Sequence, residues 1–136
     1  MNWEKTYTLN EIDHLVTELK TWGQGIPRWL LYGPMGAGKT TLVHHWIGLE
    51  VQSPTFTYIN AYANDTYHID LYRLKPEDYV RWEAIYEVLE TAALVFVEWA
   101  EKLPWPSPTP YAELHIEIVG PSERHLTAQV VGAYYQ

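Results

Sequence analysis

The chemistry that this sequence offers is concentrated in the segment GPMGAGKTT, which spans residues 33–41. Gly33 is followed by four residues and then by Gly38, Lys39 and Thr40, which is the spacing of a loop that binds phosphate. Glycines let the backbone of such a loop wrap closely around phosphate oxygens, where a Cβ atom would collide. The spacing therefore predicts a nucleotide-binding site.

The residues that follow the glycines suit different parts of a nucleotide. Lys39 is expected to reach the β- and γ-phosphates, and Thr40 is expected to place its hydroxyl on Mg²⁺. Thr41 is a candidate for a contact with the α-phosphate. The residues of this loop that we expect to bind the nucleotide are Gly33, Met35, Gly36, Ala37, Gly38, Lys39, Thr40 and Thr41.

Two acidic residues elsewhere in the chain are candidates for completing this site. An apolar run, residues 94–97, ends at Glu98, which is the pattern of a Walker B strand with Glu in place of Asp. Because Mg²⁺ prefers oxygen ligands, we favour Glu98 as a metal ligand over a solvated acid at a strand end. Asp70 shares one face of a predicted strand with His68 and Tyr72. Spacing alone leaves open whether Asp70 is merely exposed or orders a water molecule or the metal.

The elements that must position these residues can be predicted from the apolar periodicity. The fold class is α/β, a P-loop NTPase-like three-layer sandwich with a mixed, mainly parallel sheet and antiparallel hairpin additions, in a single domain over residues 1–136. We expect Asn10 to cap the first helix and Pro76 to begin the third. The predicted helices are 11–21, 39–47 and 76–90, the predicted strands are 28–32, 56–62, 66–74, 92–97, 114–119 and 126–134, and residues 103–110 are a predicted surface loop.

The composition limits the classes of function. Cysteine is absent, which excludes a disulfide framework and a thiolate metal site. The formal net charge is −8 with only nine Lys and Arg residues, so strong direct binding of nucleic acid is not expected and a partner protein would hold most of any RNA. We find no signal peptide and no apolar run that would span a membrane, and we expect a cytoplasmic protein.

Three short segments that follow the loop, in order, resemble the TsaE (formerly YjeE) family. They are SPTFT at residues 53–57, HIDLYRL at residues 68–74 and VEW at residues 97–99. The resemblance covers roughly residues 30–99. The family consists of small bacterial P-loop ATPases needed for threonylcarbamoyladenosine modification of tRNA. The resemblance implies a single α/β domain, the binding of ATP with Mg²⁺, and slow ATP hydrolysis that depends on TsaD and TsaB partners.

The resemblance also implies roles for individual residues. Thr40 and Glu98 would hold Mg²⁺, and Asp70 would organise the end of the nucleotide. The segment SPTFT would sense the γ-phosphate, with Thr55 preferred over Thr57. The turn at Glu11 would lie against the base, and Trp99 would lie near the site. The catalytic residues that we expect are therefore Lys39, Thr55, Asp70 and Glu98.

Two other classes of function stay open. A small-molecule kinase of this architecture needs cations, commonly arginines on a lid, to clamp the transferring phosphoryl group. This chain has no cluster of Arg and no Arg-rich segment, which argues against a kinase. A nucleotide-dependent interaction module without turnover is disfavoured by the paired acids Asp70 and Glu98, but they do not exclude it. A GTPase is disfavoured because the sequence contains no Asn-Lys-x-Asp motif.

Overall fold

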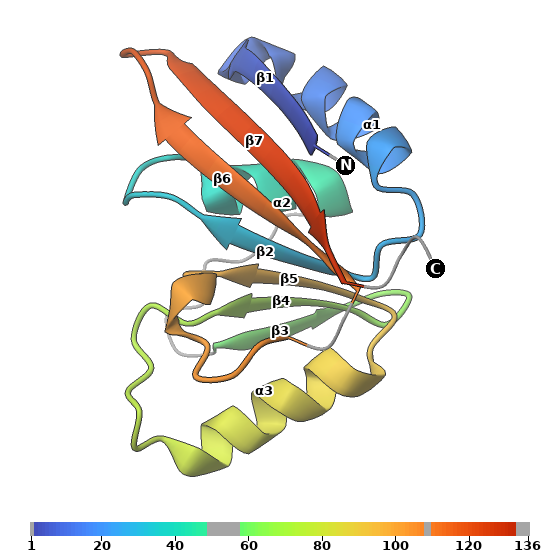
Figure 1. Cartoon of the computed structure of the whole chain (residues 1–136), viewed down its shortest axis with the longest axis vertical. Helices are drawn as coiled ribbons and strands as arrows, with labels where there is room; N and C mark the ends of the chain where they lie inside the picture. Colours follow the sequence, from blue (N-terminus) through green and yellow to red (C-terminus); the bar gives the residue numbers. More distant parts are fainter. Residues whose placement is uncertain (1, 49–57, 108–109, 133–136) are drawn as a thin grey trace.

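A computed structural model describes residues 2–48, 58–107 and 110–132 of the chain (Figure 1). Strands and helices alternate through most of its length, as the periodicity predicts. In chain order the elements are β1 (Asn2–Thr8), η1 (Leu9–Glu11), α1 (Ile12–Trp22), β2 (Arg28–Tyr32), α2 (Lys39–Ile47), β3 (Ile59–Tyr62), β4 (Thr66–Asp70), α3 (Tyr79–Thr91), β5 (Leu94–Glu98), η2 (Ala100–Lys102), β6 (Tyr111–Ile118) and β7 (Glu123–Val131).

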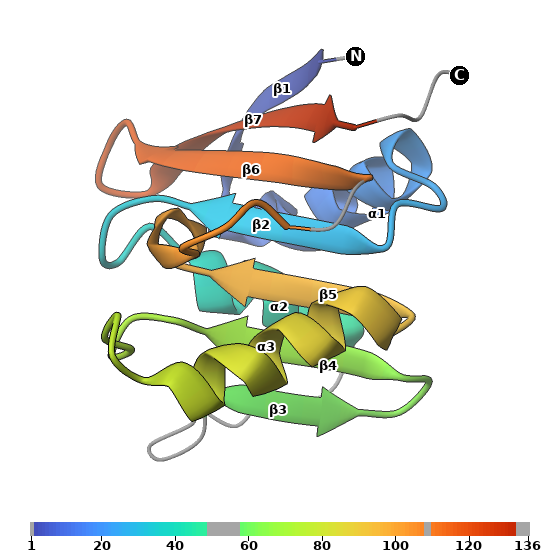
Figure 2. The same ribbon diagram turned by 60° about the horizontal axis from the view of Figure 1, so that its bottom comes forward.

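The strands form one seven-stranded sheet in the order β1-β7-β6-β2-β5-β4-β3. Its centre is parallel, since β2 pairs in parallel with β5 and β6, and β5 pairs in parallel with β4. Both margins are antiparallel, with β3 on β4 at one side and β7 and β1 beyond β6 at the other. Figure 2 shows α3 crossing one face of this sheet. The sheet is therefore mixed, with hairpin additions at its margins.

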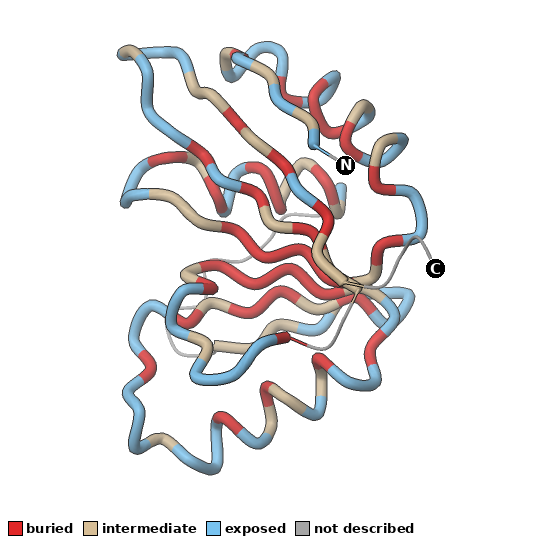
Figure 3. The backbone as a smooth tube through the Cα atoms, in the orientation of Figure 1, coloured by how far each residue is buried: buried red, intermediate tan, exposed pale blue. Residues whose placement is uncertain are grey.

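The helices cover both faces of the sheet and make three layers. Alternate residues of β2 belong to different cores, because Trp29 and Leu31 pack with α1 and α2, whereas Leu30 packs with α3. In β5, likewise, Phe96 belongs to the first core and Val97 to the second. A strand with both faces covered should be apolar throughout, and the central strands are accordingly buried (Figure 3). No helix in the described parts of the chain is long and apolar enough to cross a membrane.

Several predicted elements agree closely with the structure. The strand predicted at residues 28–32 and the helix predicted at residues 39–47 have the predicted bounds in β2 and α2. The turn predicted at residues 63–65 joins β3 and β4, and Asn64 and Asp65 both have positive φ angles, 64° and 55°. Positive φ at both central residues is the geometry of a tight hairpin turn. The start of the strand predicted at residues 56–62 lies outside the described residues.

Other boundaries were predicted wrongly. The strand predicted to reach residue 74 ends at Asp70, because the chain then turns and the Leu74 N–H bonds to the Leu71 carbonyl at 3.1 Å. The third helix does not begin at Pro76 but at Tyr79. The turn before it is closed by Asp78, whose carboxylate accepts the Lys75 N–H at 2.8 Å.

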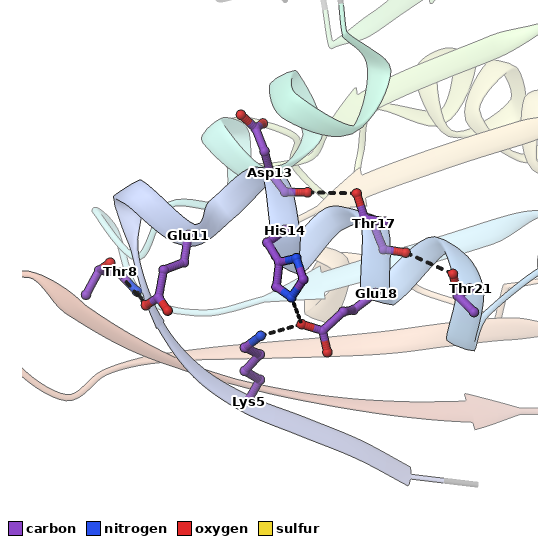
Figure 4. A network of polar contacts seen from close by, with 8 residues as sticks. All are labelled: Lys5, Thr8, Glu11, Asp13, His14, Thr17, Glu18 and Thr21. Carbon is purple, nitrogen blue, oxygen red and sulfur yellow. Dashed lines mark hydrogen bonds and ion pairs between the residues drawn. The ribbon is translucent and has the colours of Figure 1, made fainter.

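The N-terminal strand β1 was not predicted, and it is tied to α1 by polar contacts (Figure 4). The predicted cap at Asn10 is wrong, since the turn is closed by Glu11 and Thr8. The Glu11 carboxylate accepts the Thr8 backbone N–H at 2.9 Å and the Thr8 hydroxyl at 3.1 Å. These two hydrogen bonds, the backbone one first, lower the pKa of Glu11. Lys5 of β1 also pairs with Glu18 of α1.

Glycine at the end of α1 is required by close packing. A Cβ atom at Gly23 would lie 2.3 Å from Cη2 of Trp29, a ring that is 1% exposed. We expect Gly23→Ala to lower the free energy of unfolding by about 1–3 kcal/mol, because the buried ring has little room to move. Urea unfolding measures this, with Gly120→Ala as the control, since its Cβ atom would meet nothing closer than 3.7 Å. Equal stability of the two variants would contradict the expectation.

Candidate functional site

The parallel strands bring the loop and the two acids to one edge of the sheet. Glu98, the last residue of β5, is in register with Asp70 of β4 and with Leu31 of β2. The phosphate loop follows β2 directly, so the carboxyl ends of three neighbouring strands meet here. Ligands of open α/β sheets bind at this end of the strands. The predicted site residues of the loop, β4 and β5 therefore lie together.

The loop has the backbone conformation that its glycines allow. Gly36 and Gly38 have φ angles of 81° and 99°, in a region where a residue with a side chain is strained. The loop turns so that the Ala37 N–H bonds to the Pro34 carbonyl at 3.1 Å. Gly38 then leads directly into α2. The unpaired N–H groups at the start of a helix, together with its dipole, make an anion site.

The hydroxyl of Thr40 faces the carboxylate of Glu98. The hydroxyl oxygen lies 2.9 Å from Oε1 and 2.8 Å from Oε2 of Glu98. A second group holds the same carboxylate, since Nε2 of His68 lies 2.5 Å from Oε2. Because a carboxylate only accepts, His68 donates this hydrogen bond. The side chains of His68 and Glu98 are 1% and 3% exposed, so Glu98 is a buried acid with a fixed orientation.

Lys39 lies folded back against the loop. Its Nζ atom donates to the Gly33 carbonyl at 2.5 Å and to the Pro34 carbonyl at 3.2 Å. The same atom lies 4.0 Å from the ring centroid of Trp99, within the range of a cation–π contact. Burial lowers the pKa of Lys39, and the nearby Glu98 partly opposes this shift. The Lys39 ammonium is thus held against the loop in a position with little access to solvent.

Trp99 and Asp70 form the rim of the site. Trp99 has a φ angle of 58°, which is uncommon for an aromatic residue and is associated with functional sites. Its ring lies over Lys39 and contacts Tyr72, with the two ring centroids 5.0 Å apart. The Asp70 carboxylate accepts the Tyr72 N–H at 2.9 Å. One Asp70 oxygen is thereby occupied, while the residue stays half-buried beside Glu98.

Two cavities adjoin the loop. The first, of about 330 Å³, is lined by Met35, Gly36, Ala37, Gly38, Lys39, Thr40, Thr41, Asp70, Tyr72, Glu98 and Trp99. The second, of about 510 Å³, is lined by Tyr7, Thr8, Leu9, Asn10, Ile12, Gly36, Ala37, Gly38, Thr41, Pro121, Ser122 and Arg124. The linings of the two cavities share Gly36, Ala37, Gly38 and Thr41.

The larger cavity has features that the sequence did not indicate. Arg124, from the hairpin of β6 and β7, donates from Nε to the Ala37 carbonyl at 3.2 Å and from Nη2 to the Gly36 carbonyl at 3.3 Å. The Arg124 side chain therefore contacts the backbone of the phosphate loop from a distant part of the sequence. Burial raises the pKa of Tyr7, which also lines this cavity, to about 12. Neither residue belongs to a motif. The pairing of β7 with β6, which lies beside β2, brings Arg124 to the loop, and the pairing of β1 with β7 sets Tyr7 opposite Arg124.

Some predicted site residues are not placed by this geometry. Thr55 and Thr57, the candidates for sensing the γ-phosphate, lie outside the described residues. The side chain of Glu11 bonds to Thr8, and Glu11 is not among the residues that line the larger cavity. Its neighbours Asn10 and Ile12 do line it. The turn therefore adjoins this cavity, while contact of the turn and of Glu11 with a base stays a prediction.

With this geometry established, comparison with known proteins identifies the family. The model of a family described as threonylcarbamoyl adenosine biosynthesis protein TsaE matches residues 6–126. The chain belongs to the TsaE family. The part of the chain that matches the family model includes the phosphate loop, Asp70, Glu98 and Arg124.

Individual relatives agree with this assignment. A TsaE protein from Nostoc sp. is 40% identical over 116 residues, which cover 75% of this chain and 67% of the relative. A TsaE protein from Rickettsia bellii is 34% identical, with 70% and 72% covered, and one from Haemophilus influenzae is 38% identical, with 53% and 51% covered. The crystal structure of Bacillus subtilis YdiB is similar in fold, with a TM-score of 0.68 at 26% identity over 97% of this chain and 88% of that one.

The burial of Lys39 has a consequence for stability. Because desolvation disfavours its charged form, we expect Lys39→Met to raise the melting temperature of the nucleotide-free chain, by about 3 °C if roughly 1 kcal/mol is recovered. Thermal unfolding followed by circular dichroism measures this. Lys20→Met, at an exposed position of α1, is the matched control and should change little. A lower melting temperature for Lys39→Met would show that the contacts of the ammonium outweigh its desolvation.

His68 matters because it supplies a donor to a buried carboxylate. His68→Leu leaves Glu98 with one hydrogen bond fewer, and we expect the free energy of unfolding to fall by about 1–3 kcal/mol. His68→Gln keeps an N–H donor and should cost less. Urea unfolding of both variants measures the difference. If His68→Leu were at least as stable as His68→Gln, this role of His68 would be contradicted.

Proposed function

We propose that this chain is an Mg²⁺-dependent ATPase subunit for threonylcarbamoyladenosine modification of tRNA. It hydrolyses ATP slowly by itself and acts with TsaD-like and TsaB-like partners. The observation that carries the proposal is the meeting of Lys39 and Thr40 of the phosphate loop with Glu98 and Asp70 at the carboxyl ends of the parallel strands. Family membership supplies the modification pathway in which this site works.

The donor set fits Mg²⁺. Thr40 and Glu98 offer hard oxygen atoms that already converge to within 2.9 Å of each other. In the described residues no three His, Cys, Asp or Glu side chains cluster as a metal cage, which suits an ion that keeps several waters and phosphate oxygens as ligands. Thr40 and Glu98 would hold the ion. When bound, Mg²⁺ neutralises charge on the phosphate oxygens.

The chain's own groups bind and orient the triphosphate. The N–H groups of the loop surround the phosphates, and Lys39 exchanges its two carbonyl acceptors for phosphate oxygens. Asp70, beside Glu98, orders the attacking water. The larger cavity, with the turn of Thr8 and Asn10 on its wall, receives the base. His68 keeps Glu98 in one orientation throughout.

The site is short of positive charge for fast phosphoryl transfer. Among the described residues that line the two cavities, the cations are Lys39 and Arg124. Arg124 is engaged with the carbonyls of Gly36 and Ala37 and is therefore not available to the γ-phosphate. Charge developing in the transition state needs cationic donors. We therefore expect slow turnover by the chain alone, and a partner that supplies a cationic donor in trans would raise the rate.

The net charge of −8 argues that tRNA reaches the complex through the partners and not through this chain. The TsaD-like and TsaB-like proteins then present the RNA, while ATP hydrolysis by this chain resets the complex. A kinase would instead need to bring cations to the same site from a lid, and none of the described segments around the two cavities supplies one.

Measurement of ATP hydrolysis tests the proposal. We expect slow turnover by the purified chain, a rise of about tenfold or more when TsaD and TsaB are added, and loss of both rates in Lys39→Ala and Glu98→Ala. Lys20→Ala, at an exposed position of α1, is a control that should keep both rates. Rapid turnover without partners would contradict the proposal. ATP consumption driven by a metabolite and not by the partners would favour a kinase.

A further inference from the structure

A third cavity lies away from the phosphate loop, between α3 and the proline-rich segment that follows η2. Its volume is about 680 Å³, and we call it the α3 groove. No residue of the phosphate loop takes part in it. The residues that line it are Pro76, Tyr79, Trp82, Glu83, Tyr86, Glu90, Pro104, Trp105 and Pro106.

The walls of the α3 groove are joined by hydrogen bonds. The Tyr86 hydroxyl donates to the Trp105 carbonyl at 2.5 Å and accepts the Trp105 N–H at 3.0 Å. Their rings also meet edge to face, with centroids 5.6 Å apart. At the start of α3, Nε1 of Trp82 donates to the Lys75 carbonyl at 2.9 Å. The groove is therefore formed before anything binds, which lowers the entropic cost of binding.

The surface of the groove combines exposed aromatic rings with unbalanced negative charge. Tyr79 and Trp105 are 73% and 63% exposed, and exposed residues of these types are enriched in protein interfaces. Glu83 and Glu90 add two carboxylates, and neither forms an ion pair within the described residues. None of the described lining residues is Lys or Arg. A ligand that carries positive charge beside apolar groups complements this surface.

Both walls of the groove continue directly from the nucleotide site. The α3 wall follows Asp70 through residues 71–78, and the opposite wall follows Glu98 through Trp99 and η2. The two connections also contact each other, because Nζ of Lys102 donates to the Tyr72 carbonyl at 2.5 Å, and the ring of Tyr72 contacts that of Trp99. The nearest lining residues, Pro76 and Pro104, thus lie six residues along the chain from Asp70 and Glu98, respectively.

We propose that the α3 groove docks a segment of a protein partner that presents Lys or Arg next to an apolar side chain. The basic side chain pairs with the carboxylate of Glu83 or of Glu90, and the apolar one packs on Tyr79 and Trp105. Docking there brings the partner to the segments that carry Asp70 and Glu98. The inference rests on the proposed function in that the partner to be tested is the TsaD–TsaB complex.

Two pairs of charge reversals test the electrostatic part. The double variant Glu83→Lys/Glu90→Lys changes the groove, whereas Glu87→Lys/Glu117→Lys makes the same change in net charge at exposed positions that do not line it. Binding of each variant to purified TsaD–TsaB is measured by calorimetry. We expect the dissociation constant to rise about tenfold or more for the groove pair and less than about twofold for the control pair.

A second comparison tests the apolar part. Tyr79→Ala removes a ring that lines the groove, and Val80→Ala shortens the adjacent side chain, which is 81% exposed and does not line it. We expect the first change to weaken binding about tenfold and to reduce the stimulation of ATP hydrolysis at a fixed partner concentration. We expect Val80→Ala to change neither the binding of the partner nor the stimulation of ATP hydrolysis. Melting temperature and ATP affinity without partner are measured for every variant and should match those of the unchanged chain.

The outcomes separate this inference from the proposed function. If the unchanged chain binds TsaD–TsaB and is stimulated, but the groove variants behave like their controls, the docking site is wrong and the proposed function stands. Equal weakening by both charge pairs would also overturn it, since long-range charge would then be the cause. If sedimentation shows that the groove variants disrupt a dimer of this chain, the occupant is a second copy. Failure of the unchanged chain to bind the partners overturns both proposals.

Discussion

The parallel pairing of β4, β5 and β2 is the constraint on which the site depends. It sets Asp70 beside Glu98, and Glu98 beside the strand from which the phosphate loop leaves. A shift of one residue in either pairing would turn the acids to the opposite face of the sheet, away from Thr40. The register is held because both faces of these strands are buried, with Phe96 and Trp29 in one core and Val97 and Leu30 in the other.

The same constraint explains why polar groups are tolerated so deep in the molecule. Glu98 and His68 are almost fully buried, and an isolated buried charge is costly. Here the carboxylate receives hydrogen bonds from Thr40 and His68, and the ammonium of Lys39 lies on loop carbonyls and an aromatic ring. One cost remains, because Nδ1 of His68 is buried and has no hydrogen-bond partner within the described residues. Groups held in this way are oriented before a ligand arrives, which is what a phosphate-binding site requires.

Sequence patterns predicted the centre of this arrangement well. A short apolar strand, a glycine-rich turn and a helix are local features, and β2 and α2 have the predicted bounds. Glu98 was found because an acid directly after the apolar run 94–97 is also a local pattern. These elements obey rules that act over a few residues, so they can be derived without knowledge of the rest of the chain.

The features that were missed depend on distant contacts. Strand β1 has alternating polar residues and becomes a strand only by pairing with β7, more than a hundred residues away. Arg124 reaches the loop through the pairing of β7 with β6, which lies beside β2, and no motif marks it. His68 was assigned to the correct face of its strand, but its contact with Glu98 follows from the register between β4 and β5. The start of α3 was misplaced because the Asp78 side chain closes a turn before the helix.

The central claim is that Thr40 and Glu98 form a metal-dependent ATP site. The most direct measurement is the affinity for ATP by titration calorimetry, with and without Mg²⁺, for the unchanged chain and for Glu98→Gln. We predict that Mg²⁺ strengthens binding to the unchanged chain and has much less effect on the variant, while both bind ATP equally without the metal. An equal effect of Mg²⁺ on the two proteins, or no binding of ATP at all, would contradict the claim.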